Sequence, residues 1–338
     1  MKNGITRFNF FLDQLQTLLT KAGKQKNPGL WLYQNNARTP LFMLEGLAKM
    51  YAGLHNKKKF SKIKEHFKQL EDILGAIDYY DAFSKEFAGN KNIPVPVTAY
   101  LQAQAREKIQ SLNEALTENE WLGAEKNRVA KIRKKLDEAD WKKSSAEIKS
   151  IQDFYNGAIA AIVSFTGKTN FRFTNVEVDV HELRRKLRWL SIYPQALRGA
   201  IQLSSSRMKN GQVKTPVKAL EKYLTPEIIN SPFNKMPDAA DNENFLLLEQ
   251  NYFYALSWMI AQLGKLKDAG LRLIAIREAL QQLSSITEAE ALNKAKTFIG
   301  GDQPDLQQIL TRADGMCKTY FKEQNLQKLI IGCAATIS

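Results

Sequence analysis

The chain has 338 residues, of which 44% are hydrophobic, enough for one large domain or two medium ones with a substantial core. Lysine and arginine outnumber aspartate and glutamate by 49 to 35, and the formal net charge of +14 favours nucleic acid, anionic lipid or polyphosphate as a partner. Two cysteines, Cys317 and Cys333, are too few for a disulfide framework or a structural zinc site.

The N-terminal stretch MKNGITRFNFFLDQLQTLL predicts an amphipathic helix rather than a signal peptide, because polar residues interrupt its apolar run and it has no small-residue cleavage site. The longest apolar stretch, GAIAAIVSF at 157–165, is too short to cross a bilayer. We therefore expect a cytoplasmic protein without membrane contact.

Helical periodicity dominates the chain. Apolar residues from Phe60 to Ile77 recur at alternating three- and four-residue steps, which is typical of a packed helix. Period-two alternation is scarce, so the sequence argues against a β-sheet, and Pro194 is expected to kink its helix. The predicted helices span 4–22, 40–54, 59–88, 96–115, 119–138, 145–165, 176–203, 242–284, 287–298 and 304–325, with one short helix near 216–223.

Two stretches, ILGAIDYYDAF and QLGKLKDAGLR, can be overlaid at a shared Leu-Gly pair that contains Gly75 in the first and Gly264 in the second. In each stretch an aspartate follows, and an earlier helix carries an arginine near its start, Arg38 or Arg184. This pattern predicts an all-α fold in which two helical bundles form a degenerate tandem pseudo-repeat with a cleft along their shared axis. The two halves span 1–170 and 171–338.

The stretch DVHELRRKLRWL carries an unusual density of positive charge. On a helix its basic residues fall within an arc of about 100°, opposite a stripe of leucines. A solvated helix face would interleave acids at i+4, but only Glu182 is available and it lies off this arc. Guanidinium groups suit phosphate because they donate two parallel hydrogen bonds, so an anion site and a solvated face both stay open. The basic arc contains His181, Arg184, Arg185 and Arg188.

The same stretch resembles the second-repeat signature of the CHAD family, the conserved-histidine α-helical domains: a histidine, an arginine three residues on, then further basic residues every three or four. LGKLKDAG is similar to that family's second element, with Lys267 and Asp268 at the basic and acidic positions. The first half keeps Arg38, but Asn35 stands where the histidine belongs and Phe42 replaces a basic residue.

The resemblance implies two helical bundles around a basic central channel, and binding of inorganic polyphosphate. In this hypothesis the protein is not an enzyme and needs no cofactor or metal. Arg38 and Lys267 add counter-charge to the arc of His181, Arg184, Arg185 and Arg188, and an outer ring is formed by Lys49, Lys58, Lys62 and Lys68.

Two alternatives use the same positive charge. A nucleic-acid-binding protein would add stacking aromatics, of which only Trp189 adjoins the arc. A phosphohydrolase would need metal-binding carboxylates that face the arc. The three histidines His55, His66 and His181 show no metal-ligand spacing, and the Gly-Lys-Thr at Gly167 lacks the glycine and the strand of a nucleotide-binding loop.

Overall fold

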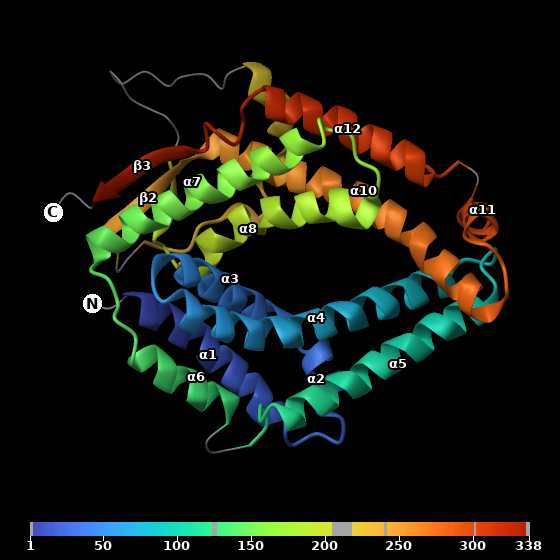
Figure 1. Ribbon diagram of the computed structural model, residues 1–338, viewed down its shortest axis with the longest axis horizontal. Helices are drawn as coiled ribbons and strands as arrows, with labels where there is room; N and C mark the ends of the chain where they lie inside the picture. The colour runs from blue at the N-terminus through green and yellow to red at the C-terminus, as the bar shows by residue number, and fades with distance from the viewer. Residues whose placement is uncertain (1–2, 124–126, 205–217, 240–241, 301, 336–338) are drawn as a thin grey trace.

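The computed structural model describes residues 3–123, 127–204, 218–239, 242–300 and 302–335 of a predominantly helical chain (Figure 1). The predicted all-α class is confirmed, with one small sheet as an exception. In the first half of the chain the structure describes α1 (Asn3–Ala22), α2 (Pro28–Gln34), α3 (Arg38–Leu54), α4 (Lys57–Ala88), α5 (Val95–Glu118), α6 (Arg128–Asp137) and α7 (Ser144–Lys168).

The second half opens with η1 (Val176–His181), a π-helical turn that leads directly into α8 (Glu182–Ala196). The long helix α10 (Gln250–Leu283) follows, with α11 (Glu288–Ile299) and α12 (Leu306–Lys322) after it. Between α8 and α10 lie the short 3₁₀ helix η2 (Lys218–Tyr223), the single-turn helix α9 (Pro226–Ile229) and the 3₁₀ turn η3 (Pro232–Asn234). The expected short helix near 216–223 corresponds to η2 where it falls within the described residues.

The expectation that the chain has no sheet was wrong. Strand β2 (Asn244–Glu249) pairs in parallel with β1 (Ile201–Ser204) and antiparallel with β3 (Ile330–Ala335). The central strand carries the run Phe-Leu-Leu-Leu, in which Leu246 and Leu248 are buried and Phe245 and Leu247 are partly buried. Such a short apolar run cannot be told from a buried helical turn by periodicity, so β2 falls within the helix predicted over 242–284.

The helix predicted over 176–203 is also shorter than expected, since α8 ends at Ala196, two residues after Pro194. The chain then turns sharply into β1 through Gly199, whose φ of +87° is a left-handed conformation. A Cβ at Gly199 would lie 2.1 Å from the carbonyl oxygen of Asp238, so only glycine allows the two backbones to cross here. The helix predicted over 119–138 begins late, at Arg128.

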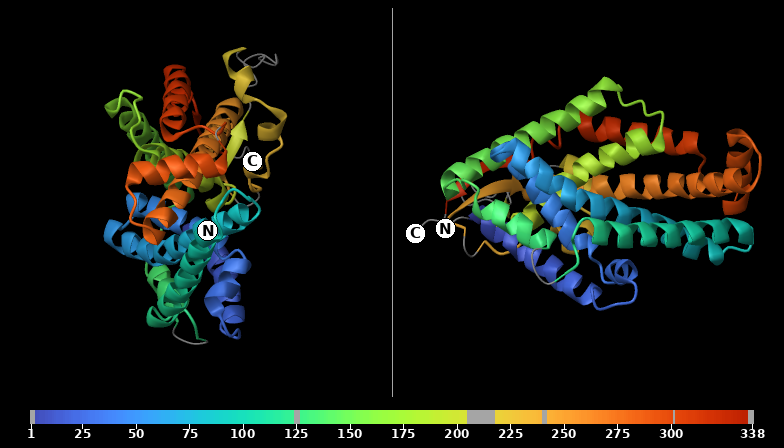
Figure 2. Two further views of the ribbon diagram at one scale, coloured as in Figure 1. Left: turned by 90° about the vertical axis from the view of Figure 1, so that its right-hand side faces the viewer. Right: turned by 60° about the horizontal axis from the view of Figure 1, so that its bottom comes forward.

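The helices form two long layers that face each other (Figures 1 and 2). One layer contains α3, α4 and α5, and the other contains α7, α8 and α10, with α10 reaching α5 at the far end of the molecule. The layers meet where α3 packs on α8, and a Cβ at Gly46 would lie 3.1 Å from the ring of Trp189. Buried apolar residues from both halves belong to one cluster, so the two predicted halves share a core.

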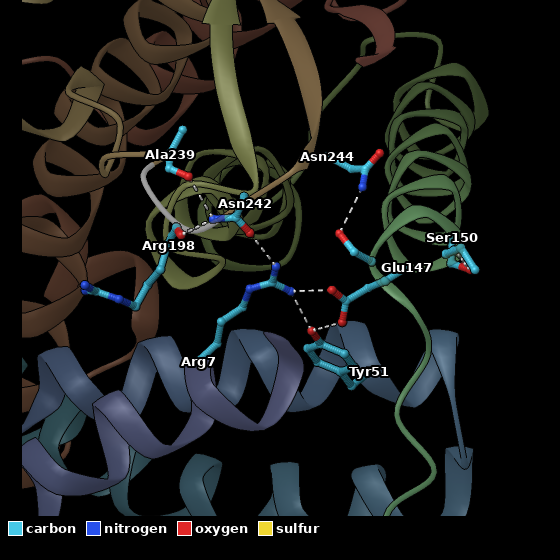
Figure 3. Close-up of polar contacts among 10 residues, drawn as sticks. Arg7, Tyr51, Glu147, Ser150, Arg198, Ala239, Asn242 and Asn244 are labelled. Atoms are coloured by element: carbon cyan, nitrogen blue, oxygen red, sulfur yellow. Dashed lines mark hydrogen bonds and ion pairs between the residues drawn. The ribbon is translucent and has the colours of Figure 1, made fainter. Parts of the chain in front are cut away.

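A buried ion pair fastens α1 and α7 to each other and to the second half (Figure 3). The Arg7 Nη1 atom lies 2.9 Å from Glu147 Oε2 and donates to the hydroxyl of Tyr51, which in turn donates to Glu147 Oε1 over 2.7 Å. The other terminal nitrogen of Arg7 donates to the side chain of Asn242, just before β2. A buried charge pair with every partner supplied in this way fixes the relative position of the segments that carry it.

We expect Arg7→Met to destabilise the protein by about 3–5 kcal/mol, because it leaves the Glu147 carboxylate buried without a cation. Urea unfolding of the purified variant measures the loss. The matched control is Arg133→Met, which removes a partly exposed cation that pairs with the exposed Asp13 and donates to Asn9, and it should change the free energy of unfolding by less than about 1 kcal/mol. Equal losses in the two variants would show that the buried pair has no special role.

A cleft between the two helical layers

The two stripes predicted for α8 are confirmed as a packing face and a polar face. Leu183, Leu187 and Leu190 are fully buried, whereas Arg184 and Arg188 are only partly buried. Asn175 caps the preceding π turn by accepting hydrogen bonds from two backbone amides, and this turn places His181 one helical turn before the arginines. The stretch VEVDVH is therefore a helix entry, and its acidic residues lie in the first turn, where the helix dipole favours them.

The polar face of α8 lines a cavity of about 770 Å³ between α3, α4, α8 and α10. The cavity brings together five of the ten predicted site residues. They are Arg38, His181, Arg184, Arg188 and Lys267.

A second cavity of about 370 Å³ lies beside the first and shares Arg38, Arg184 and Arg188 with it. This second cavity adds Arg185, Lys49 and Lys68 from the predicted set, together with Lys64 and Lys186. Eight of the ten predicted residues thus line one cavity or the other. Lys58 and Lys62 line neither and lie at exposed positions of α4.

Arg38 and Arg184 occupy equivalent places against the two Leu-Gly motifs. A Cβ at Gly75 would lie 2.8 Å from Arg38 Nη2, and a Cβ at Gly264 would lie 3.1 Å from Arg184 Nε. In each case the arginine Nε also donates a hydrogen bond to the residue four positions before the glycine. The acceptor is the carboxylate of Glu71 at 2.6 Å for Arg38 and the backbone oxygen of Ile260 at 3.3 Å for Arg184.

A tandem repeat would place equivalent residues in equivalent contacts, and these two arginine–glycine contacts agree with that expectation. Each glycine lets a guanidinium group lie close against the backbone of a neighbouring helix, which a larger residue would prevent. A pseudo-twofold relation between the complete halves remains a prediction.

Arg188 differs from the other arginines in its surroundings. Its guanidinium lies 4.7 Å from the ring centre of Phe42, and that of Arg38 lies 5.2 Å from the same centre. Within the part of the chain that the structure describes, the Arg188 guanidinium makes no hydrogen bond or ion pair. Burial, together with the nearby charges of Arg184 and Arg38, lowers the pKa of Arg188 to about 10.

Most other cations of the site have acidic partners. Arg38 pairs with Glu71 and Asp78, and Lys267 pairs with Asp268 at 2.7 Å. His181 Nδ1 lies 3.1 Å from Glu177 on the preceding turn.

Glu182, which the helix geometry places off the basic arc, nevertheless pairs with Arg185 at 2.7 Å and with Lys186 at 2.9 Å. Long side chains reach an acid at i−3 that their Cα positions alone place off the arc.

The sequence reasoning missed two contributors to the cavity. Phe42, noted only as a lost basic residue, forms the wall between Arg38 and Arg188. The segment from Pro226 to Asn234, which lies between the helices predicted near 216–223 and over 242–284, lines the large cavity with Ile228 and Phe233. No local signal in that segment indicates its position, since its fold depends on contacts with α8 and α10.

A carboxylate pair lies at the base of the smaller cavity, where Glu45 faces Glu71. Burial and the neighbouring Glu71 charge raise the pKa of Glu45 to about 7. One turn away on α3, burial lowers the pKa of Lys49 to about 8, although Glu45 opposes this shift. The Lys49 ammonium lies 4.7 Å from the ring centre of Trp189.

The described residues contain neither a metal-binding cluster nor a helix that could span a membrane. No group of three or more histidine, cysteine, aspartate or glutamate side chains there could hold a metal ion. None of the helices there is both long enough and apolar enough to cross a membrane.

Comparisons of the chain with known protein families, with curated proteins and with solved structures found no match.

The raised pKa of Glu45 predicts a pH-dependent stability. The folded chain binds a proton that the unfolded chain releases between about pH 4.5 and 7, so this contribution is present below pH 4.5 and is lost as the pH rises through 7. We expect the stability advantage of Glu45→Gln over the native protein to grow by on the order of 2 kcal/mol between pH 4.5 and 7.5.

Urea unfolding at the two pH values gives this difference. The control is Glu65→Gln on the exposed face of α4, which should track the native protein at both pH values. If native protein and Glu45→Gln respond in parallel, Glu45 titrates normally and the carboxylate pair is solvated.

Proposed function

We propose that the cleft between the two layers binds inorganic polyphosphate or a similar polyanion without chemical turnover. The observation that supports this proposal is the convergence of Arg38, Arg184 and Arg188 on one cavity, with Arg188 lacking an acidic partner among the described residues. A largely buried guanidinium beside two others is unfavourable unless an anion joins them. Phosphate oxygens supply that anion and accept the paired hydrogen bonds that guanidinium groups donate.

The shared lining of the two cavities supports a chain-like ligand. Arg38, Arg184 and Arg188 belong to both, and the smaller cavity continues past them to Lys49, Lys64 and Lys68 on the facing helices. Successive phosphates placed along this line would meet cations from α3, α4 and α8. A single inorganic phosphate would use only part of it.

The resemblance to the CHAD family points to the same ligand class. The contribution of the first half is weaker than that of the second, because Arg38 is neutralised by Glu71 and Asp78 and Phe42 stands at a basic position. We therefore assign most of the binding free energy to α8. Incubation with polyphosphate and Mg²⁺ or Mn²⁺ tests the non-catalytic part of the proposal: release of phosphate that ends on mutation of one acidic residue of the cleft would contradict it.

Replacement of both Arg184 and Arg188 by alanine should weaken polyphosphate binding by about 100-fold or more. Each charge-assisted hydrogen bond contributes roughly 1.5–3 kcal/mol, and a tenfold change in affinity corresponds to about 1.4 kcal/mol. Calorimetric titration of long-chain polyphosphate at about 0.15 M salt measures the loss. Binding of the native protein should also weaken as salt rises, because bound phosphates release condensed counterions, by analogy with nucleic acids.

The control is the double replacement of Lys134 and Lys135 by alanine, which lowers the net charge equally. Both lysines are on α6, which lines neither cavity. Equal losses in the two double variants would mean that the ligand responds only to the general positive field. Duplex DNA that displaces polyphosphate at equal phosphate concentration would favour a nucleic-acid partner instead.

Arg188→Met should have opposite effects on binding and on stability. In buffer free of phosphate and sulfate we expect the variant to be more stable than the native protein, on the order of 1 kcal/mol, because it removes an unpaired charge that Arg184 and Arg38 repel. The comparison is Arg38→Met, which strands Glu71 and should destabilise the protein. Urea unfolding distinguishes these outcomes, and a loss in Arg188→Met as large as that in Arg38→Met would give Arg188 a structural role.

A further inference from the structure

The large cavity extends beyond the arginines to apolar side chains that inorganic polyphosphate would not use. They are Met43 and Ile192 from α3 and α8, and Ile228 and Phe233 from the segment between β1 and β2, with polar residues such as Glu227 and Ser231 among them. We call this region the apolar end. Phe233 is 77% exposed although it lines the cavity. Pockets for organic ligands combine apolar and aromatic walls with a few polar groups, so a ligand in the cavity would cover this ring.

The backbone that carries Phe233 is held firmly on both sides. Gln195 of α8 donates a hydrogen bond to the backbone oxygen of Lys235 at 2.8 Å. The Ser257 hydroxyl of α10 donates to the side-chain oxygen of Asn234 at 2.6 Å. The side-chain nitrogen of Asn234 donates in turn to the backbone oxygen of Ile228 at 2.7 Å. The exposed ring is therefore presented by an anchored turn.

The arginines and the exposed ring belong to one cavity. Gln195 and Ser191 follow Arg188 on α8, and they line the part of the cavity between Arg188 and the 226–234 segment. A volume of about 770 Å³ lies within the range of pockets that enclose organic ligands of moderate size. A ligand with phosphates at one end and a flat ring at the other would satisfy both parts of this lining.

We propose that the large cavity takes a phosphate ester with a planar ring, such as a nucleoside polyphosphate, with its phosphates on Arg184 and Arg188 and its ring on Phe233. This inference rests on the proposed function, since it assigns the phosphates to the same arginines. It adds a second subsite that gives preference for an organic phosphate over a purely inorganic one. Stacking of a base on an aromatic side chain is a contact that tolerates any base.

The test compares ATP with inorganic tripolyphosphate, without divalent cations, by calorimetric titration. We expect ATP to bind the native protein about 10-fold more tightly, in line with the contribution of one stacked base. Phe233→Ala should remove this preference and leave the affinity for tripolyphosphate unchanged. Val95→Ala, which alters a residue that is 78% exposed and outside the cavity, should retain it.

The outcomes separate the two proposals. Equal binding of ATP and tripolyphosphate by the native protein, with tripolyphosphate still dependent on Arg184 and Arg188, overturns the ring subsite and leaves the proposed function intact. A preference for ATP that survives in Phe233→Ala overturns the assignment of the ring to Phe233. Failure of both ligands to bind overturns the proposed function itself.

A third comparison distinguishes a flat ring from an aliphatic chain. Geranyl diphosphate and pyrophosphate differ only in an apolar chain. The ratio of their affinities therefore measures how much a flexible apolar group gains in binding from contact with the apolar end. A larger ratio for this pair than for ATP and tripolyphosphate would overturn the planar-ring assignment.

Discussion

The close contact between an arginine and a helix glycine, repeated at Arg38 with Gly75 and at Arg184 with Gly264, sets the geometry of the cleft. Because the glycine has no side chain, the guanidinium lies along the neighbouring helix. Its Nε donates a hydrogen bond to the residue of that helix one turn before the glycine. Each contact brings α3 close to α4 or α8 close to α10 and places its arginine at the edge of a cavity. The cavities lie between these two helix pairs, and Arg188 lies where α3 and α8 approach each other.

The net charge of the chain does not measure the free positive charge in the cleft, because most cations there are paired with acids. Arg38, Lys267 and Arg185 each have an acidic partner, and Asp78, Asp268 and Glu182 are those partners. Ion pairs of this exposed kind contribute little to stability, but they hold long side chains in place at the edge of the cavity. Net charge governs encounter with a polyanion, whereas the few cations left without partners decide where it binds.

The sequence predicted the helices and the polar side of α8 because both depend on local periodicity. The leucine stripe from Leu183 to Leu190 and the arginine at each Leu-Gly motif can be found by counting residues. The strand Asn244–Glu249 could not be found in this way, since a short apolar run occurs both in strands and in buried helical turns. Phe233 could not be predicted either, because its position depends on hydrogen bonds from α8 and α10 that are far away in the sequence.

Burial disfavours the positive charge of Arg188, whereas most other cations of the cleft have acidic partners. The proposed binding of an anion accounts for the presence of this residue. Removal of the charge would relieve repulsion from Arg184 and Arg38 and leave an apolar side chain against Phe42. In the absence of a ligand, that change would increase the free energy of unfolding. Under the proposed function a bound anion offsets this cost, and the free energy that relieves the repulsion then adds to binding. The proposal thus accounts for a cation that is unfavourable in the empty protein.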